Sequence, residues 1–298
     1  MSEAIGCHAI DGETRVVGVI GWPVRHSLSP LMHNAAFGVL GLNWVYVPFA
    51  VTPDQVTATV QAVRALDLVG LNVTIPHKLA VLPLMDEVSA EARALGAVNT
   101  IINDDGRLRG RNTDGEGFLR SLREIGGDVT GRRVALIGAG GSARAVALAV
   151  AKAAVAKLTI INRTVEKAEL VAEMVQAAQP GAAAKVLGLE TEEAGQAVRE
   201  AQVVIDSTAV GMYPHHETAP VIPVEWLQRE QTVCDLTYNP RETVLLKAAK
   251  AVGAITLDGT GMLVHQGALA LEYWTGREAP VEVMREALLA GLAKRSAG

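Results

Sequence analysis

The fold is decided by residues 131–164, GRRVALIGAGGSARAVALAVAKAAVAKLTIINRT. The apolar run Val134–Ile137 predicts a buried parallel strand, and the Ala-rich stretch Arg144–Ala156 predicts the helix that follows it. A second apolar run, Leu158–Ile161, predicts the next strand. The stretch is therefore expected to form a β-α-β unit, in which two parallel strands are joined by a crossover helix.

The loop between the first strand and the helix has G-x-G-x-x-A spacing. Small residues at these positions permit a tight turn, close approach of the backbone to a pyrophosphate, and close helix–strand packing. The helix N-terminus that follows presents N–H groups and a positive dipole end to an anion. We therefore predict a dinucleotide site at Gly138, Ala139, Gly140, Gly141, Ser142 and Ala143.

The residues after the second strand indicate which dinucleotide is bound. Sites for NAD usually carry Asp or Glu here, and the carboxylate accepts a hydrogen bond from the ribose 2′-hydroxyl. This chain has Asn162, Arg163 and Thr164 at that place and Lys167 one turn later. These groups suit a 2′-phosphate, and cations are otherwise unfavourable at a helix start. We therefore predict NADP rather than NAD as the cofactor.

Composition excludes several classes of protein. The 298 residues suit two domains, 49% of them are hydrophobic, and the net charge of −5 argues against nucleic acid as a main partner. Cys7 and Cys234 are the only cysteines, so we expect no disulfide framework. The first fifteen residues have no apolar core, so we expect no secretion signal and a cytoplasmic location. The uncharged segment 27–53 is interrupted by Asn, Gly and Pro, which argues against a membrane helix. His215 and His216 have no further spaced ligand, and we expect no metal site.

The other segments predict an α/β arrangement in both halves of the chain. In the first half, strands are expected over 16–20, 44–49, 69–73, 100–103 and 108–111. Helices are expected from an N-cap at Ser29 to about Gly41, from a capping box at Thr52 to about Leu66, and over 86–95. In the second half, helices are expected over 115–125, 165–178, 190–199, 242–252 and 281–292, with another carrying Gln266, and strands over 184–187, 203–205, 232–236 and 254–257.

Polar residues follow the apolar strands of the first half. They form four clusters: Ser27 with Ser29; Asn72 with Thr74 and Lys78; Asn99 with Thr100; and Asn112 with Asp114. Ligands of open parallel sheets bind outside the carboxyl ends of the strands. We therefore expect the four clusters to converge on one pocket for a small-molecule substrate.

Eight motifs in this order resemble those of the shikimate dehydrogenase family and span nearly the whole chain. They are GWPVRHSLSP (21–30), GLNVTIPHK (70–78), GAVNT (96–100), NTDG (112–115), GAGGSAR (138–144), NRT (162–164), YNP (238–240) and GTGMLVHQGA (259–268). The resemblance implies reversible, NADPH-dependent reduction of 3-dehydroshikimate to shikimate in aromatic amino-acid biosynthesis. It also implies a two-domain α/β fold: an open α/β substrate domain (1–113), an NADP-binding Rossmann domain (114–257), and C-terminal helices (258–298) that pack back on the first domain.

The resemblance assigns roles to individual residues. Lys78 is expected to be the general acid/base, and Asp114 its partner. The residues implied in substrate binding are Ser27, Ser29, Asn72, Thr74, Asn99, Asp114, Tyr238 and Gln266. Cofactor contacts are implied for the glycine-rich loop, for Asn162–Thr164 and Lys167, and for Thr208, Val210, Leu236, Gly259, Gly261 and Met262.

Some alternatives stay open at the level of sequence. Asp206 stands where many members of the family have Asn, and a carboxylate there is expected to affect cofactor binding. The runner-up activity is a dual-specificity quinate/shikimate dehydrogenase. Ser29 and Asp114 could also serve as helix N-caps, and the protonation state of Lys78 is open because a carboxylate favours its charge whereas burial opposes it. The oligomeric state is expected to be monomer or homodimer.

Overall fold

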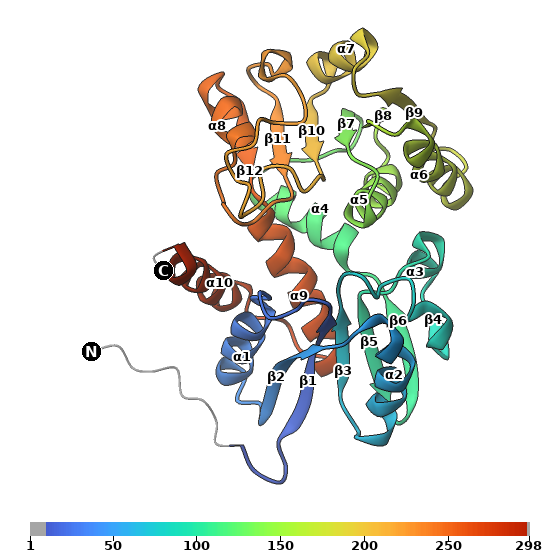
Figure 1. Cartoon of the computed structure of the whole chain (residues 1–298), viewed down its shortest axis with the longest axis vertical. Helices are drawn as coiled ribbons and strands as arrows, with labels where there is room; N and C mark the ends of the chain where they lie inside the picture. Colours follow the sequence, from blue (N-terminus) through green and yellow to red (C-terminus); the bar gives the residue numbers. More distant parts are fainter. Residues whose placement is uncertain (1–9, 297–298) are drawn as a thin grey trace. The chain divides into compact units, whose positions relative to one another are not determined.

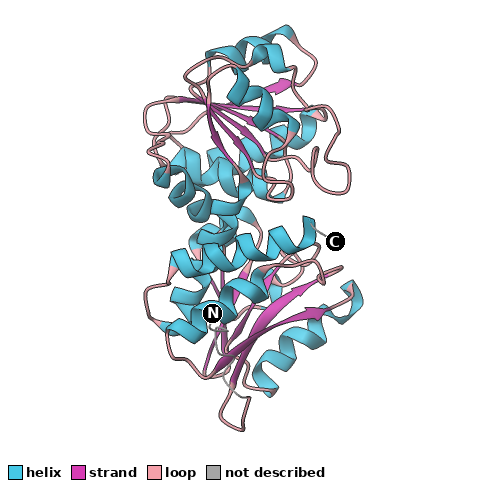
Figure 2. Cartoon of the chain, turned by 90° about the vertical axis from the view of Figure 1, so that its left-hand side faces the viewer, coloured by secondary structure: helices cyan, strands magenta, loops and turns pink. Residues whose placement is uncertain are grey.

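The computed structural model describes residues 10–296, and Cys7 and most of the segment considered above for a secretion signal lie outside them. The chain divides into two compact units (Figure 1). The first is built from Met1–Thr113 with Val264–Gly298, and the second from Asp114–Leu263. Each unit contains its own six-stranded sheet, and helices cover both faces of each sheet (Figure 2). The predicted α/β class is confirmed.

The sheet of the first unit is mixed. Its strand order is β2-β1-β3-β5-β6-β4, with bounds β1 Arg15–Gly21, β2 Trp44–Ala50, β3 Gly70–Val73, β4 Glu87–Val88, β5 Thr100–Asp104 and β6 Arg107–Arg111. β1 is parallel to β2 and β3, whereas β5 is antiparallel to both β3 and β6. This reversal places the start of β5 and the end of β6 beside the carboxyl end of β3, because Asn72 pairs with Thr100, and Thr100 with Arg111.

Helices pack on both faces of this sheet. They are α1 Ser29–Val39, α2 Val56–Ala65, α3 Ala90–Leu95, α10 Val281–Ser296 and the C-terminal part of α9 Gly259–Thr275, with short 3₁₀ turns at Pro53–Gln55 and Leu82–Leu84. On one face, Val56, Val60 and Val63 of α2 pack in a core that includes Leu71 and Ile101 of the strands. On α9, the indole of Trp274 donates to the carbonyl of Ile101 at 3.0 Å.

Three helix starts in the first unit differ from the sequence prediction. Ser29 is the first residue of α1 and Leu28 is its N-cap, so the Ser29 hydroxyl does not cap the helix. The predicted capping box at Thr52 is not formed either, since its side chain makes no cap bond and a 3₁₀ turn precedes α2. The expected helix over 86–95 begins only at Ala90, where Ser89 accepts from the Ala92 N–H at 3.2 Å, because residues 87–88 pair with β6 as β4.

The sheet of the second unit is entirely parallel, with strand order β12-β11-β10-β7-β8-β9. Its strands are β7 Arg133–Ile137, β8 Lys157–Asn162, β9 Ala184–Gly188, β10 Val203–Asp206, β11 Thr232–Asp235 and β12 Ile255–Leu257. Its helices are α4 Asp114–Glu124, α5 Gly141–Lys152, α6 Val165–Ala178, α7 Glu192–Glu200 and α8 Val244–Ala251, with a 3₁₀ turn at Val224–Trp226 and the start of α9. The order reverses at β7, and this is where a doubly wound sheet binds its ligand.

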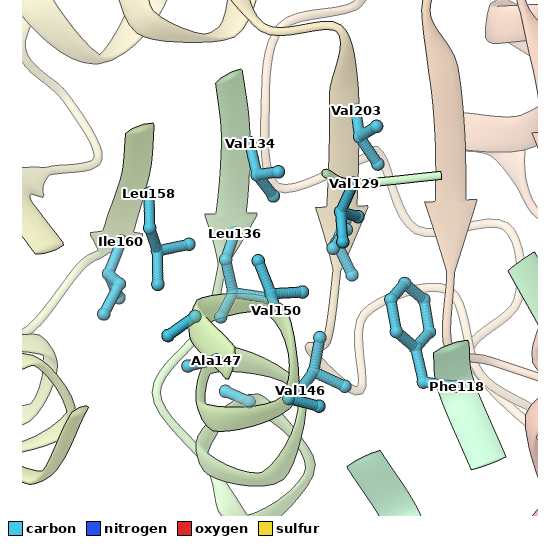
Figure 3. Packing of buried hydrophobic residues seen from close by; sticks show 14 of the residues in the cluster. Phe118, Val129, Val134, Leu136, Val146, Ala147, Val150, Leu158, Ile160 and Val203 are labelled. Atoms are coloured by element: carbon cyan, nitrogen blue, oxygen red, sulfur yellow. The ribbon is translucent and has the colours of Figure 1, made fainter. Parts of the chain in front are cut away.

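The Ala-rich helix α5 is the centre of this unit's core. Val146, Ala147 and Val150 face strand residues such as Leu136 and Leu158 (Figure 3). Small residues let the helix approach the sheet closely, which is why all residues from Ala145 to Ala151 are buried. α5 begins three residues before the predicted Arg144 and ends at Lys152 rather than Ala156, because Ala154 adopts a left-handed φ of 55°.

A histidine is buried in the core of the first unit. The ring of His33 on α1 is 0% exposed and stacks on Tyr46, with ring centroids 4.3 Å apart and planes 3° from parallel. Neither ring nitrogen has a hydrogen-bond partner among the described residues. Burial therefore lowers the pKa of His33 from 6.5 to about 3, so the ring is neutral and packs as an aromatic group.

This burial makes the protein sensitive to acid. The folded pKa lies below the unfolded one, so the stabilisation is complete above pH 6.5 and is lost as the pH falls toward 3. Between pH 6.5 and 3, protonation of His33 in the unfolded state should lower the unfolding free energy by up to about 1.4 kcal/mol for each pH unit, and we expect His33→Leu to abolish this contribution. Urea unfolding at pH 7, 6 and 5 measures the slope of unfolding free energy against pH. The exposed histidine variant His26→Leu serves as control, and an equal change of slope in both variants would refute the assignment.

Candidate active site

A buried hydrogen-bond network lies at the end of β3 in the first unit. Asn72 Nδ2 donates to the Asn99 carbonyl at 3.3 Å and to Thr100 Oγ1 at 3.2 Å, and Asn72 Oδ1 accepts from the hydroxyl of Tyr46 at 2.8 Å. Asn99 Oδ1 accepts from Thr100 Oγ1 and from the Thr113 N–H, both at 2.9 Å. All five residues are at most 5% exposed. The network ties together two of the polar clusters that the sequence placed after separate strands, and it also holds Thr113, which lies between Asn112 and Asp114.

Tyr46 is the member of this network that the sequence analysis missed. It lies in the middle of β2 and is 1% exposed, so its place in an apolar strand resembled that of a core residue. Burial raises the pKa of the Tyr46 hydroxyl well above its usual value, and the nearby side chain of Ser29 opposes this effect. The residue type alone could have indicated this role, because the hydroxyl of a buried Tyr usually has a polar hydrogen-bond partner.

The two predicted serines lie together in the loop that leads into α1. The Ser29 N–H donates to Ser27 Oγ at 3.3 Å, and Ser29 is 8% exposed. Arg295 of α10 donates to the carbonyl of Ser27 at 3.5 Å, which ties this loop to the C-terminal helix.

The segment around Lys78 is held by its backbone. The carbonyl of Lys78 accepts from the Val98 N–H at 2.9 Å, one residue before Asn99. His77 is 1% exposed, and its Nε2 lies 2.7 Å from the Val51 carbonyl. A Cβ on Gly21 would stand 2.5 Å from Thr74 Cγ2, so the ends of β1 and β3 approach as closely as glycine allows. Lys78 itself is half-buried on this anchored loop.

The remaining predicted substrate residues fall on other elements. Gln266 lies on α9 one residue before Gly267, where a Cβ would stand 3.3 Å from His33 Nε2. Asp114 is 6% exposed and is the first residue of α4, and Tyr238 is half-buried after β11; both belong to the second unit. The backbone of Thr113, which precedes Asp114, is held by Asn99.

The glycine-rich loop of the second unit follows β7. Gly138 has φ +108°, which a residue with a side chain rarely adopts, and a Cβ there would stand 2.5 Å from Ser207 Oγ. Ser207 Oγ in turn donates to the Ile137 carbonyl at 2.6 Å. The loop after β7 is therefore held directly against the loop after β10.

The next two glycines face open space. Gly140 is the N-cap of α5 without a side-chain cap, and Gly141 is the first helical residue. A Cβ on either would meet no atom within 4 Å, so protein packing does not explain why these positions are glycine. Open backbone at a helix N-terminus beside a strand end is what a pyrophosphate group requires. The residues at this site therefore fit a dinucleotide.

The residues proposed for the 2′-phosphate end β8 and begin α6. Asn162 Nδ2 donates to the Thr164 carbonyl at 2.8 Å, which shapes the turn. Thr164 is the N-cap residue of α6, but its hydroxyl makes no cap bond. Arg163, Thr164 and Lys167 are all exposed at this helix start. Two cations beside a helix N-terminus are unfavourable unless an anion binds there.

The other predicted cofactor residues lie in the loops after β10 and β11 and at the start of α9. The Val210 N–H donates to Thr208 Oγ1 at 3.3 Å in the loop after β10. A Cβ on Gly259 would stand 2.1 Å from the carbonyl oxygen of Leu236, and a Cβ on Gly261 would stand 2.8 Å from Ser121 Cβ. Met262 is 9% exposed and packs in the same core as α5. Close packing against Leu236 and Ser121 thus accounts for the glycines at 259 and 261.

Asp206 is a buried acid with a second acid beside it. It is 2% exposed, its Oδ1 accepts from the Thr208 N–H at 2.8 Å, and in the sheet it pairs with Asp235. Burial and the charge of Asp235 raise the pKa of Asp206 to about 6. The pKa of Asp235 is also raised by burial, although Thr243 and Thr237 donate to its oxygens at 2.7 and 2.9 Å.

The raised pKa destabilises the protein at neutral pH. The folded state holds the proton of Asp206 more tightly than the unfolded state, so stability is lost as the pH rises from about 4 to about 6. We expect Asp206→Asn to increase the unfolding free energy at pH 7.5 by up to about 3 kcal/mol and to have little effect below pH 4. The amide oxygen still accepts from Thr208. Thermal unfolding at both pH values tests this.

Asp128 serves as a control for which the opposite change in stability is expected. Hydrogen bonds from Thr130 lower the pKa of its carboxyl, so Asp128→Asn should destabilise the protein at pH 7.5. A destabilised Asp206→Asn variant at pH 7.5 would contradict the proposed penalty.

Within residues 10–296, no group of three or more His, Cys, Asp or Glu side chains is placed to hold a metal ion. In the same part of the chain, no helix is both long enough and apolar enough to cross a membrane. The exposed pair His215 and His216 lies in a loop, where His216 Nδ1 is 3.2 Å from the Pro214 carbonyl.

Comparison with known proteins covers nearly the whole chain. Residues 19–101 match the shikimate dehydrogenase substrate binding domain, residues 120–244 match shikimate / quinate 5-dehydrogenase, and residues 259–289 match the shikimate 5'-dehydrogenase C-terminal domain. The NADP(+) shikimate dehydrogenase of Methanopyrus kandleri is 49% identical over 94% of this chain and 97% of its own length.

Two solved structures have the same fold. A shikimate dehydrogenase in complex with NADP+ superposes with a TM-score of 0.90 and 44% identity, covering 95% of this chain and 98% of that one. Shikimate 5-dehydrogenase from Listeria monocytogenes, in complex with shikimate and NAD, has a TM-score of 0.90 and 38% identity, covering 94% of this chain and 98% of that one.

Proposed function

The chain belongs to the shikimate dehydrogenase family, and from this premise we propose that it catalyses the reversible, NADP-dependent interconversion of shikimate and 3-dehydroshikimate. The observation that carries the proposal is the buried polar network at the end of β3. Its hydroxyl and amide groups match a polyhydroxylated carboxylic acid. A site built from such groups rejects compounds that lack the matching hydroxyls, because polar atoms would then be left unpaired.

Substrate recognition is proposed to be divided among several segments of the chain. Ser27 and Ser29 would donate to the carboxylate of the substrate. Asn99, Thr74 and Gln266 would bind the ring hydroxyls, with Asn72 supporting them. Asp114 would bind a ring hydroxyl, and Tyr238 would contact the carboxylate. The backbone bonds that anchor residues 74–78 fix these positions before substrate binds, so less entropy is lost on binding.

The proton chemistry is assigned to Lys78. NADPH, when bound at the glycine-rich loop, supplies the hydride for reduction of the ketone. Negative charge that develops on the substrate oxygen requires a proton, and the Lys78 ammonium is proposed to donate it; in the oxidation direction the amine accepts it. Asp114 is proposed as the partner that orients Lys78 and favours its charged form. The half-buried position of Lys78 shields the proton transfer from bulk water in part.

Replacing Lys78 tests this assignment. We expect Lys78→Ala to lower kcat for shikimate oxidation by about 10²- to 10⁴-fold with a modest change in KM, because a proton-transfer group is lost while the binding groups stay. Steady-state kinetics at pH 8 measure both constants. Lys185→Ala, which removes an exposed lysine from β9, is the control. Retention of wild-type kcat by Lys78→Ala would remove Lys78 from the mechanism.

Cofactor and substrate selectivity test the proposed function itself. We expect initial rates to favour shikimate over quinate and NADP over NAD. Arg163→Ala should raise KM for NADP by about tenfold, since it removes a charge-assisted hydrogen bond to the 2′-phosphate. KM for NAD, which lacks that phosphate, should stay unchanged and serves as an internal control. Comparable rates with quinate would instead assign the dual-specificity quinate/shikimate activity.

Two further properties are proposed. We expect the chain to act as a monomer or homodimer, which light scattering after size-exclusion chromatography distinguishes. We also expect it to work in the cytoplasm. NADPH-dependent reduction and the unpaired, buried Cys234 suit a reducing compartment.

A further inference from the structure

Thr100 is a buried residue of the network at the end of β3 and follows Asn99, which is proposed to bind the substrate. It is the first residue of β5 and is 0% exposed, so its side chain makes no contact with a ligand that enters from solvent. Its Oγ1 accepts from Asn72 Nδ2 at 3.2 Å and donates to Asn99 Oδ1 at 2.9 Å. One hydroxyl thus links two amide side chains.

Main-chain groups fix the orientation of both amides. The Asn99 carbonyl can only accept, so the amide atom of Asn72 that lies 3.3 Å from it is the donor Nδ2. The Thr113 N–H can only donate, so the atom of Asn99 that lies 2.9 Å from it is the acceptor Oδ1. Because Asn72 already donates to Thr100, the proton of the Thr100 hydroxyl is directed to Asn99 Oδ1.

The Asn99 side chain is therefore held by its oxygen. An amide oxygen has two lone pairs, and the Thr113 N–H and the Thr100 hydroxyl each donate to Oδ1. The amide nitrogen Nδ2 is turned the other way and donates to Thr113 Oγ1 at 2.9 Å. In this orientation Asn99 meets a ligand hydroxyl as a hydrogen-bond donor.

The Thr100 hydroxyl is itself held in place from the other side. Tyr46 donates to Asn72 Oδ1 at 2.8 Å, which keeps Asn72 Nδ2 turned toward Thr100. Threonine is β-branched, and this restricts rotation about χ1. The hydroxyl therefore keeps one position between Asn72 and Asn99.

We propose that Thr100 is a positioning residue that holds the Asn99 amide in the orientation in which Nδ2 donates to a ring hydroxyl of the substrate. The proposal rests on the proposed function. Without the Thr100 hydroxyl, Asn99 Oδ1 loses one of its two donors and the amide gains freedom to rotate. Ordering this side chain on binding would then lower the affinity for substrate.

The experiment compares Thr100→Val with Thr100→Ser by steady-state kinetics of shikimate oxidation. Valine keeps the shape of the side chain and removes the hydroxyl. We expect KM for shikimate to rise by about five- to tenfold, as for loss of one buried hydrogen bond, while kcat and KM for NADP change less than about twofold. Serine keeps the hydroxyl, so Thr100→Ser should hold KM within about twofold of the value for the unsubstituted chain.

A double-mutant cycle tests whether Thr100 acts through Asn99. In the Asn99→Ala background, Thr100→Val should have little further effect on KM for shikimate, because the side chain that it positions is gone. Thr159→Val is the matched control, since Thr159 is a threonine of β8 in the second unit and is only 3% exposed. This control should leave all kinetic constants unchanged.

The results separate positioning from a merely structural role. A structural role predicts a smaller fraction of active enzyme in Thr100→Val with an unchanged KM, and that result would overturn the proposal. Equal KM values in Thr100→Val and Thr100→Ser would overturn it as well. If Thr100→Val does not fold, Thr100→Cys provides the same test, because a thiol is a weak donor and should give a KM above that of Thr100→Ser.

Failure of this proposal is distinguishable from failure of the proposed function. Effects of Thr100→Val and Asn99→Ala that multiply independently would remove the positioning role while the dehydrogenase activity stands. Absence of shikimate oxidation by the unsubstituted chain would overturn both.

Discussion

The arrangement of the first unit depends on hydrogen bonding to the buried side-chain amide of Asn72. Asn72 lies near the end of β3 and is 5% exposed, and its side chain has partners on two other segments: Tyr46 of β2, and the adjacent Asn99 carbonyl and Thr100 hydroxyl at the start of β5. An unpaired amide in such a place is strongly unfavourable, so these segments are held in register by the requirement that every polar atom be bonded. The antiparallel direction of β5 makes this possible, because it returns Asn99 and Thr100 to the end of β3.

The second unit depends on a steric constraint instead. Its parallel sheet brings the ends of β7 and β10 side by side, and Gly138 is the point where the two following loops touch. A glycine with positive φ satisfies both the turn and the contact with Ser207. The open backbone at Gly140 and Gly141 then remains available to a phosphate group. In the proposed function, the first unit would select a ligand by hydrogen-bond complementarity, and the second would select one by shape and by the charges at Arg163 and Lys167.

The sequence predicted much of this arrangement, and its failures have physical reasons. Periodicity located the strands and the Rossmann-like unit because buried parallel strands are continuous apolar runs. Strand 87–88 was predicted as helix because two residues carry no periodicity of their own and depend on pairing with β6. Tyr46 was missed because its hydrogen-bond partner, Asn72, is far away in the sequence. The spatial relation of Lys78 to Asp114, and the role of each residue in the reaction, stay predictions.

The incorrect assignment of Ser29 as an N-cap bears directly on the chemistry. A serine at the N-cap gives its oxygen to a backbone N–H of the first turn and is held by the helix. Here the cap position belongs to Leu28, so the hydroxyl of Ser29 is not used in folding the helix terminus. The shift of one residue in the helix start thus leaves the Ser29 hydroxyl without a capping role, as its proposed contact with a substrate carboxylate requires.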